Sequence, residues 1–298
     1  MRYGHGVALC LAAGTVWSLM GLGLRQIEEA SVWAILFWRS VGMIPVLFAF
    51  IWWNSGGRAL GAIRAVGVAG VLGGLALVVA FAGAIYAFQT TTVANAVLLF
   101  AASPFVAAVL GWIALREAVR PLTWVAIAIA VFGMYLMVRD GLGTGAMLGN
   151  LAALLSAAGF GAYTVVLRWG RVGEMLPVAL LGAVFAVLVA GVILPLQGEV
   201  ILVSAHDMAV AMAIGAIVVA LGMVMFTLGS KVVTAAELTL LSLVEVLLGP
   251  IWVWLFLGEK ASRNTLIGGS VLLAAVVLNG LVGSMRKPAE GVAERVVP

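Results

Sequence analysis

Charge is scarce in this sequence, and that scarcity excludes a water-soluble fold. Only 9% of the 298 residues are Asp, Glu, Lys or Arg, while 64% are hydrophobic. Soluble domains contain about 25% charged and about 45–50% apolar residues. A water-soluble core cannot bury so much apolar surface, so the chain must use lipid as its solvent. The formal net charge of +4 is therefore no sign of a nucleic-acid partner.

Residues for metal binding and covalent chemistry are also rare. Cys10 is the single cysteine, so an intrachain disulfide is impossible. The two histidines, His5 and His206, lie near the ends of apolar segments, and the sequence contains no Cys/His cluster, phosphate-binding glycine loop or serine-nucleophile motif. Asp140 and Asp207 lie at segment edges, where they cannot form an intramembrane aspartyl pair. We expect no enzyme activity, no metal and no cofactor.

What the sequence does contain is long apolar runs. Ten segments reach the roughly 20 residues that a membrane-spanning helix needs. They cover residues 6–24, 31–53, 65–88, 92–115, 121–138, 145–167, 175–196, 207–229, 233–257 and 264–284. Short connections rich in Gly, Asn and Pro separate them. The sequence predicts an all-α integral membrane protein with ten transmembrane helices.

The placement of Lys and Arg predicts the orientation of these helices. One side of the predicted membrane collects 11 of these residues and the other side 4, while Arg39 lies inside a span. Positive charge in short loops marks the cytoplasmic side. Both termini are therefore expected in the cytoplasm, which agrees with an even number of spans, and residues 285–298 are expected to form a cytoplasmic polar tail.

The chain also contains an internal repeat. A shift of 142 residues aligns "TVANAVLLFAASPFVAAVLGWIALRE" (92–117) with "TAAELTLLSLVEVLLGPIWVWLFLGE" (234–259) without a gap, pairing Trp112 with Trp254 and Glu117 with Glu259. A shift of 143 pairs Arg25 with Arg168. The predicted units are 1–141 and 142–284, each with five spans. Because five is odd, the second unit enters the membrane from the opposite side, as in secondary transporters that work by alternating access. A duplication with no transport role is the alternative.

Short motifs in both units resemble those of a known family, the drug/metabolite transporter superfamily of the EamA type. The matching elements are Ser103-Pro104 with Glu117, "SLVE" at 242–245, "LGE" at 257–259, and the basic Arg39 in "FWRS". Val246 stands where that family usually has a proline. The resemblance implies a ten-span transporter of small molecules and, within the superfamily, is greatest to bacterial aromatic amino acid exporters.

Glu245 is the main candidate site residue, because it lies near the middle of an apolar span. An ionised carboxylate facing lipid there would cost at least ~2.5–3.5 kcal/mol. It must therefore face a watery cavity, pair with a cation or take up a proton. As a functional group it would contact a substrate ammonium or act as a protonatable switch. As a structural group it would form a fixed ion pair or bond to backbone freed near Pro250.

Arg39 is the natural partner to consider for Glu245, because it is the other strongly ionisable residue well inside a span. The estimated depths of the two residues allow them to meet. Their salt bridge would either open when substrate enters or brace two helices permanently.

Further candidates are aromatic, polar or helix-breaking residues within the spans. Aromatic walls suit a mostly apolar solute, and polar groups can bind substrate or join helices. Proline frees a backbone carbonyl and can act as a hinge. The candidates are Trp17, Tyr163 and Tyr86 as aromatics, Ser103 and Asn95 as polar groups, and Pro104 and Pro250 as hinges. Ordinary packing is the alternative for each.

These observations predict a secondary transporter in the bacterial inner membrane. It would export small metabolites, amino acids above all, by alternating access, with the lipid bilayer and a small-molecule substrate as partners, and as a monomer. An exporter of multiple drugs or lipophilic cations is the main alternative. A phosphorylated substrate would require several Lys or Arg residues inside the membrane, where only Arg39 is available. A purely structural scaffold would not need an inverted repeat.

Overall fold

The computed structural model describes residues 2–139, 146–233 and 235–284, and within these ranges all regular secondary structure is helical. The predicted boundary at 141/142 and the predicted tail 285–298 lie outside the described residues. Nine stretches are long and apolar enough to cross a membrane, and a tenth helix has Leu243–Leu257 as its continuous apolar part. The prediction of an all-α membrane protein with ten helical spans is confirmed.

The helices follow one another with short connections. In chain order they are α1 (Tyr3–Trp17), α2 (Met20–Leu24), α3 (Val32–Asn54), α4 (Ala59–Ala65), α5 (Gly67–Thr90), α6 (Val93–Phe100), α7 (Ser103–Leu115), α8 (Pro121–Arg139), α9 (Met147–Trp169), α10 (Met175–Leu196), α11 (Ala205–Ala213), η2 (Ile214–Leu221), α12 (Gly222–Ser230), α13 (Ala235–Leu257) and α14 (Arg263–Ser284).

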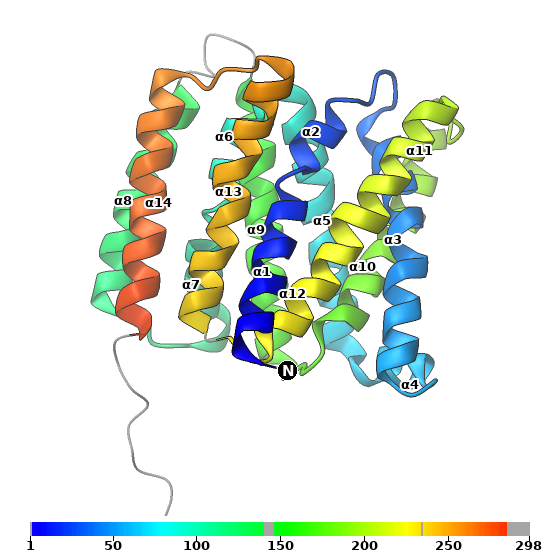
Figure 1. Ribbon diagram of the computed structural model, residues 1–298, viewed down its shortest axis with the longest axis horizontal. Helices are drawn as coiled ribbons and strands as arrows, with labels where there is room; N and C mark the ends of the chain where they lie inside the picture. Colours follow the sequence, from blue (N-terminus) through cyan, green and yellow to red (C-terminus); the bar gives the residue numbers. More distant parts are fainter. Residues whose placement is uncertain (1, 140–145, 234, 285–298) are drawn as a thin grey trace, which may run out of the picture.

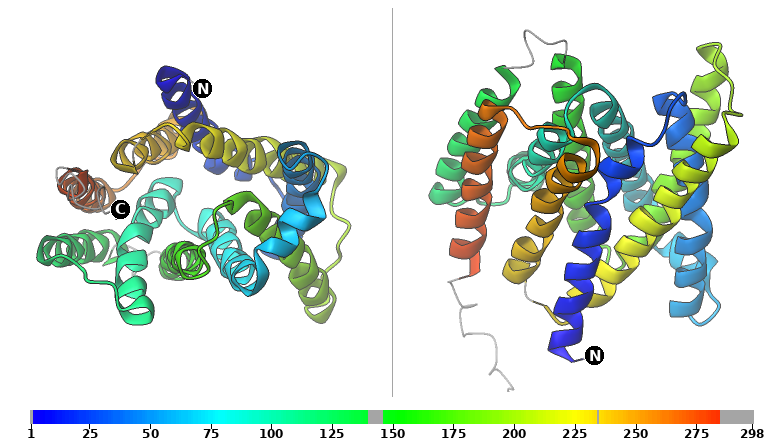
Figure 2. Two further views of the ribbon diagram at one scale, coloured as in Figure 1. Left: turned by 90° about the horizontal axis from the view of Figure 1, so that it is seen from below. Right: turned by 45° about the horizontal axis from the view of Figure 1, so that its top comes forward.

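Successive spans run in alternating directions, so that α1 begins and α14 ends on the same side of the bundle (Figure 1). We call this side the lower face and the opposite side the upper face. Seen from below, α13, α1 and α12 form one row, while α7, α9 and α5 form a row facing it (Figure 2). Helices α8 and α14 pack against each other at one edge of the molecule.

Three spans that the sequence predicts as continuous are interrupted. Span one breaks at Ser18–Leu19, where the Ser18 hydroxyl donates to the Thr15 carbonyl at 2.6 Å. Span four breaks at residues 101–102, between α6 and α7. The eighth span contains a π-helical segment, η2, between α11 and α12. Interruptions of this kind are tolerated in a membrane because neighbouring groups satisfy the freed backbone atoms.

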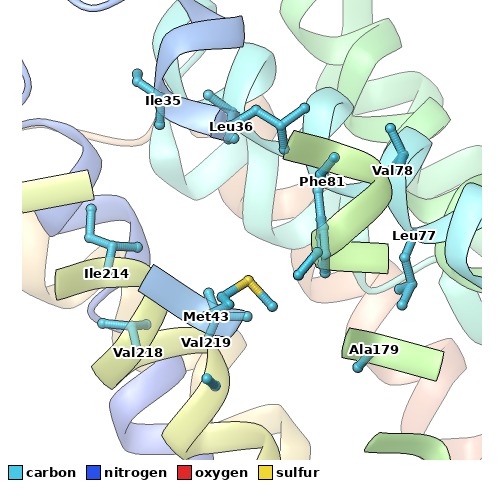
Figure 3. Close-up of a cluster of buried hydrophobic side chains, with 14 of the residues drawn as sticks. Ile35, Leu36, Met43, Leu77, Val78, Phe81, Ala179, Ile214, Val218 and Val219 are labelled. Carbon is cyan, nitrogen blue, oxygen red and sulfur yellow. The ribbon is translucent and has the colours of Figure 1, made fainter. Parts of the chain in front are cut away.

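The core lies where α3 crosses η2 and packs against α5 and α10. Met43 of α3, Leu77 of α5 and Ala179 of α10 are fully buried there, with Val219 of η2 beside them (Figure 3). The crossing is tightest at Gly215, where an added Cβ would lie 1.8 Å from the Arg39 carbonyl oxygen. Only glycine allows the two backbones to approach this closely.

Replacing Gly215 with alanine should therefore destabilise the protein. Because the clash is with backbone, one helix must shift, at a cost of about 1–3 kcal/mol. We expect Gly215→Ala to lower the melting temperature in detergent. Gly61→Ala in α4 is the matched control, because an added Cβ there meets nothing within 4 Å. Equal melting temperatures for the two variants would contradict the tight crossing.

Candidate functional site

Arg39 is held within α3 as a buried cation, and no described residue forms an ion pair with it. Only 1% of its surface is exposed, and its guanidinium lies over the Phe81 ring of α5, 4.4 Å from the ring centroid. Its Nε and Nη2 atoms have no hydrogen-bond partner among the described residues. A cation–π contact offsets part of the cost of taking this charge out of water. Two donors of this buried guanidinium therefore remain without a partner among the described residues.

Glu245 lies midway along α13, where the backbone of this helix packs against α1. Its backbone nitrogen lies 3.6 Å from the position that a Cβ on Gly14 of α1 would take. The residue is partly exposed, and none of the hydrogen bonds or ion pairs among the described residues involves its side chain. The structure does not join Glu245 to Arg39, so neither the permanent brace nor the closed salt bridge considered from the sequence is present here.

The two aromatic candidates of spans one and six differ in their surroundings. Trp17 is partly buried over Gly222 of α12, and its ring centroid lies 5.3 Å from that of Phe226. Tyr163 is fully buried in the core, and its hydroxyl lies 3.5 Å from the Met175 carbonyl, at the limit of a hydrogen bond. Tyr163 therefore has the surroundings of a packing residue, whereas Trp17 remains a candidate for contact with substrate.

Tyr86, Ser103 and the two prolines occupy positions of different kinds. Tyr86 is partly buried in α5, and its carbonyl accepts the Thr90 hydroxyl at 2.7 Å. Ser103 begins α7, and Pro104 follows it in the first turn, where a missing N–H disrupts no helical bond. The sequence predicted Pro104 inside a continuous helix, but it lies beside a break. Pro250 is inside the continuous helix α13. Their action as hinges stays a prediction.

Asn95 belongs to a buried polar cluster near the upper face that joins three spans. Its Nδ2 donates to Asn150 Oδ1 of α9, and its Oδ1 accepts the hydroxyl of Thr265 of α14 at 3.2 Å. Thr91 also donates to Asn150 Oδ1, at 2.9 Å, while Asn150 Nδ2 has no partner among the described residues. The cluster contains donors and acceptors from both repeats, which suits a role in joining helices.

Two ion pairs that sequence reasoning missed lie at opposite faces of the bundle. Arg25 Nη2 is 2.9 Å from Glu259 Oε2 at the upper face, and Arg168 Nη1 is 2.6 Å from Glu117 Oε2 at the lower face. The sequence contained the signal for both, because one register of the repeat aligns the two arginines and the neighbouring register aligns the two glutamates. The sequence did not indicate that each arginine pairs with the glutamate of the other repeat.

Two hollows in the surface lie away from these charged groups. A cleft of about 510 Å³ at the start of α1 is lined by Arg2, His5, Ala8 and Leu9. An apolar groove of about 440 Å³ is lined by residues of α13 and α14, namely Leu243, Leu247, Leu273, Ala274, Val277 and Leu278. The first hollow opens at the lower face, and the second faces outward between two spans.

Removing one member of the polar cluster should reveal how strongly it joins the helices. Thr265→Val keeps the side-chain shape but leaves Asn95 Oδ1 without its donor, which we expect to cost about 0.6–2 kcal/mol. Thr15→Val is the control, because the Thr15 hydroxyl bonds only the Leu11 carbonyl of its own helix. Unfolding in mixed micelles should show a loss for Thr265→Val alone; equal stability would contradict a helix-joining role.

Comparison with known proteins identifies a family for this chain. The model of the EamA-like transporter family matches residues 4–139 and again 147–281, once for each repeat. A solved crystal structure resembles the whole bundle, with a TM-score of 0.63 over 96% of this chain and 100% of that one. Their sequences are 17% identical, so this likeness concerns the fold alone. No curated protein matches the sequence.

Proposed function

Because the chain belongs to the EamA-like transporter family, whose members move small solutes across membranes, we propose that it is an alternating-access exporter of amino acids with apolar or aromatic side chains. The single observation that carries the substrate class is a pair of opposite, unpartnered charges. Arg39 and Glu245 both lie inside spans, and neither forms an ion pair with a described residue.

An amino acid zwitterion complements these two groups. A carboxylate suits the free donors of Arg39, because guanidinium binds carboxylates through paired hydrogen bonds. An ammonium suits the carboxylate of Glu245. Unpartnered charges are expensive within the membrane, and a zwitterionic substrate would neutralise both during its passage. The apolar surroundings and Trp17 favour an apolar side chain.

The charge distribution supports an orientation of the bundle in the membrane. The connections at the lower face contain Arg58, Arg64, Arg116, Arg120 and Arg171, and positive charge marks the cytoplasmic side. The lower face is then cytoplasmic, and the multi-pass protein lies in a bacterial inner membrane. The cleft at the start of α1 would face the cytoplasm, from which an exporter takes its substrate.

Neutralising Glu245 tests its contact with substrate. Glu245→Gln keeps the shape and removes the charge, so we expect at least a ten-fold loss of phenylalanine counterflow in proteoliposomes, because a lost contact to a charged group is worth about 1.5–3 kcal/mol. Glu174→Gln is the control, since Glu174 is exposed at the start of α10. Unchanged counterflow in folded Glu245→Gln protein would remove this carboxylate from the proposal.

Neutralising Arg39 distinguishes between two proposed substrate classes, amino acids and lipophilic cations. Arg39→Met fills a similar space without charge, and it removes the cost of keeping a cation within a span. We expect phenylalanine transport to fall about ten-fold while the melting temperature holds or rises. Transport of a cationic substrate should instead increase, because the substitution removes a positive charge that would repel it. Transport of tetraphenylphosphonium, with no phenylalanine transport by the parent protein, would favour the alternative.

A further inference from the structure

The connection between α7 and α8 is a positively charged loop at the lower face of the bundle (Figure 1). Its residues 116–120 read Arg-Glu-Ala-Val-Arg. Arg116 and Arg120 are both exposed, and neither forms an ion pair with a described residue. A connection at the end of two spans lies at the level of the lipid headgroups. The loop therefore presents two cations where a bilayer has its phosphate groups.

Glu117, the acidic residue of this loop, is neutralised on the α9 side of α7. Arg116 ends α7 in a left-handed conformation (φ 55°), which turns the chain back so that the Glu117 N–H donates to the Gly111 carbonyl at 3.3 Å. The Glu117 carboxylate then lies against α7 and accepts from Arg168 Nη1 of α9 at 2.6 Å. This ion pair compensates the charge that would repel an anion and leaves the two loop arginines uncompensated.

Two tryptophans lie about one helical turn deeper in the membrane than these arginines. Trp112 of α7 precedes Arg116 by four residues, and Trp124 of α8 follows Arg120 by four residues. Four residues of α-helix rise about 6 Å. The two ring centroids are 5.3 Å apart, with the ring planes at 90°. The rings therefore connect α7 with α8 at one depth, just inside the charged loop.

This tryptophan pair belongs to the surface of the bundle and not to its core. Helix α8 packs mainly against α14, and α7 mainly against α9. Trp112 remains 50% exposed and Trp124 39% exposed, and the apolar Ile113 and Val125 beside them are exposed as well. Within a membrane such apolar surface is solvated by lipid. Tryptophan suits this depth, because its apolar ring contacts acyl chains while its N–H reaches the headgroups.

We propose that the lower ends of α7 and α8 form a binding site for an anionic phospholipid. Arg116 and Arg120 bind the headgroup phosphate, and the upper part of an acyl chain contacts Trp112 and Trp124. Guanidinium binds phosphate through paired hydrogen bonds. The exposed rings favour a lipid over a free phosphate ion, which has no apolar part to place on them. The site does not depend on the proposed transport function.

A diffuse attraction between the basic lower face and anionic lipid is the competing explanation. Arg58 and Arg64 contribute two further charges to this face, at the two ends of α4. Six residues along a helix separate two side chains by about 120° around its axis and about 9 Å along it. These two arginines are therefore not placed to share one phosphate. They provide an equal charge without the proposed site.

Native mass spectrometry of the full-length protein in detergent can measure the affinity of the first lipid that binds. Phosphatidylglycerol is the anionic probe, and phosphatidylcholine with the same acyl chains is the zwitterionic reference. Each cation near an anionic headgroup contributes a factor of about five. We therefore expect the parent protein to prefer phosphatidylglycerol about 25-fold. Arg116→Gln with Arg120→Gln should weaken phosphatidylglycerol binding by about the same factor and abolish the preference.

Arg58→Gln with Arg64→Gln is the matched control, because it removes the same charge from the same face. We expect it to leave the affinity of the first phosphatidylglycerol unchanged. Trp112→Leu with Trp124→Leu tests the apolar part of the site and should weaken the binding of both lipids while preserving the preference. Melting temperatures measured beside the affinities show that each variant is folded.

Three results would overturn the proposal. They are equal affinities of the parent protein for the two lipids, equal losses in the two arginine double variants, and an unchanged lipid affinity in the tryptophan double variant. The second result would indicate diffuse surface charge, and the third a site for an anion alone. The measurement needs no transported substrate, so a failure to transport phenylalanine would contradict the proposed function and leave the lipid site standing.

Discussion

The cost of placing charge in hydrocarbon governs this protein more than any other physical term. Most of its few charged residues lie in the connections at the two faces, where water and headgroups solvate them. Two ion pairs join helix ends, and the polar cluster of Asn95 and Asn150 buries its amides by sharing hydrogen bonds between spans. Against this background, Arg39 and Glu245 stand out, because each is an ionisable group within a span that forms no ion pair with a described residue.

The inverted repeat gives the two faces of the bundle equivalent ion pairs with different additional partners. A chain with two equal halves could settle into a symmetric bundle, in which equivalent ion pairs have equivalent partners. Here the upper pair satisfies the orphan N–H at the beginning of α6, while the lower pair is directed back to its own helix α7.

Much of the fold could be predicted from the sequence, and the site much less. Apolar length predicted the ten spans but not their interruptions. Ser18 carries no strong helix-breaking signal, whereas Pro104 beside the break at residues 101–102 does, and it was considered only as a hinge within a continuous helix. Glu245 was recognisable as a costly charge, but its missing partner was not, since depth along a helix does not specify the direction of a side chain. Tyr163 was a candidate beside Trp17 because spans one and six occupy matching places in the two repeats, yet it is buried in the core beside Phe160.

Hydropathy and the odd number of spans in each repeat are local or periodic properties, so the sequence by itself determined an all-helical membrane protein with two inverted halves. The family motifs at Ser103-Pro104 and Glu245 added its transporter class. Only the tertiary structure decided which charges meet, because Arg25 and Glu259 are separated by 234 residues and their approach depends on how α1 and α13 pack. Pairing across a helix interface is a property of the packed bundle, and no single segment contains it.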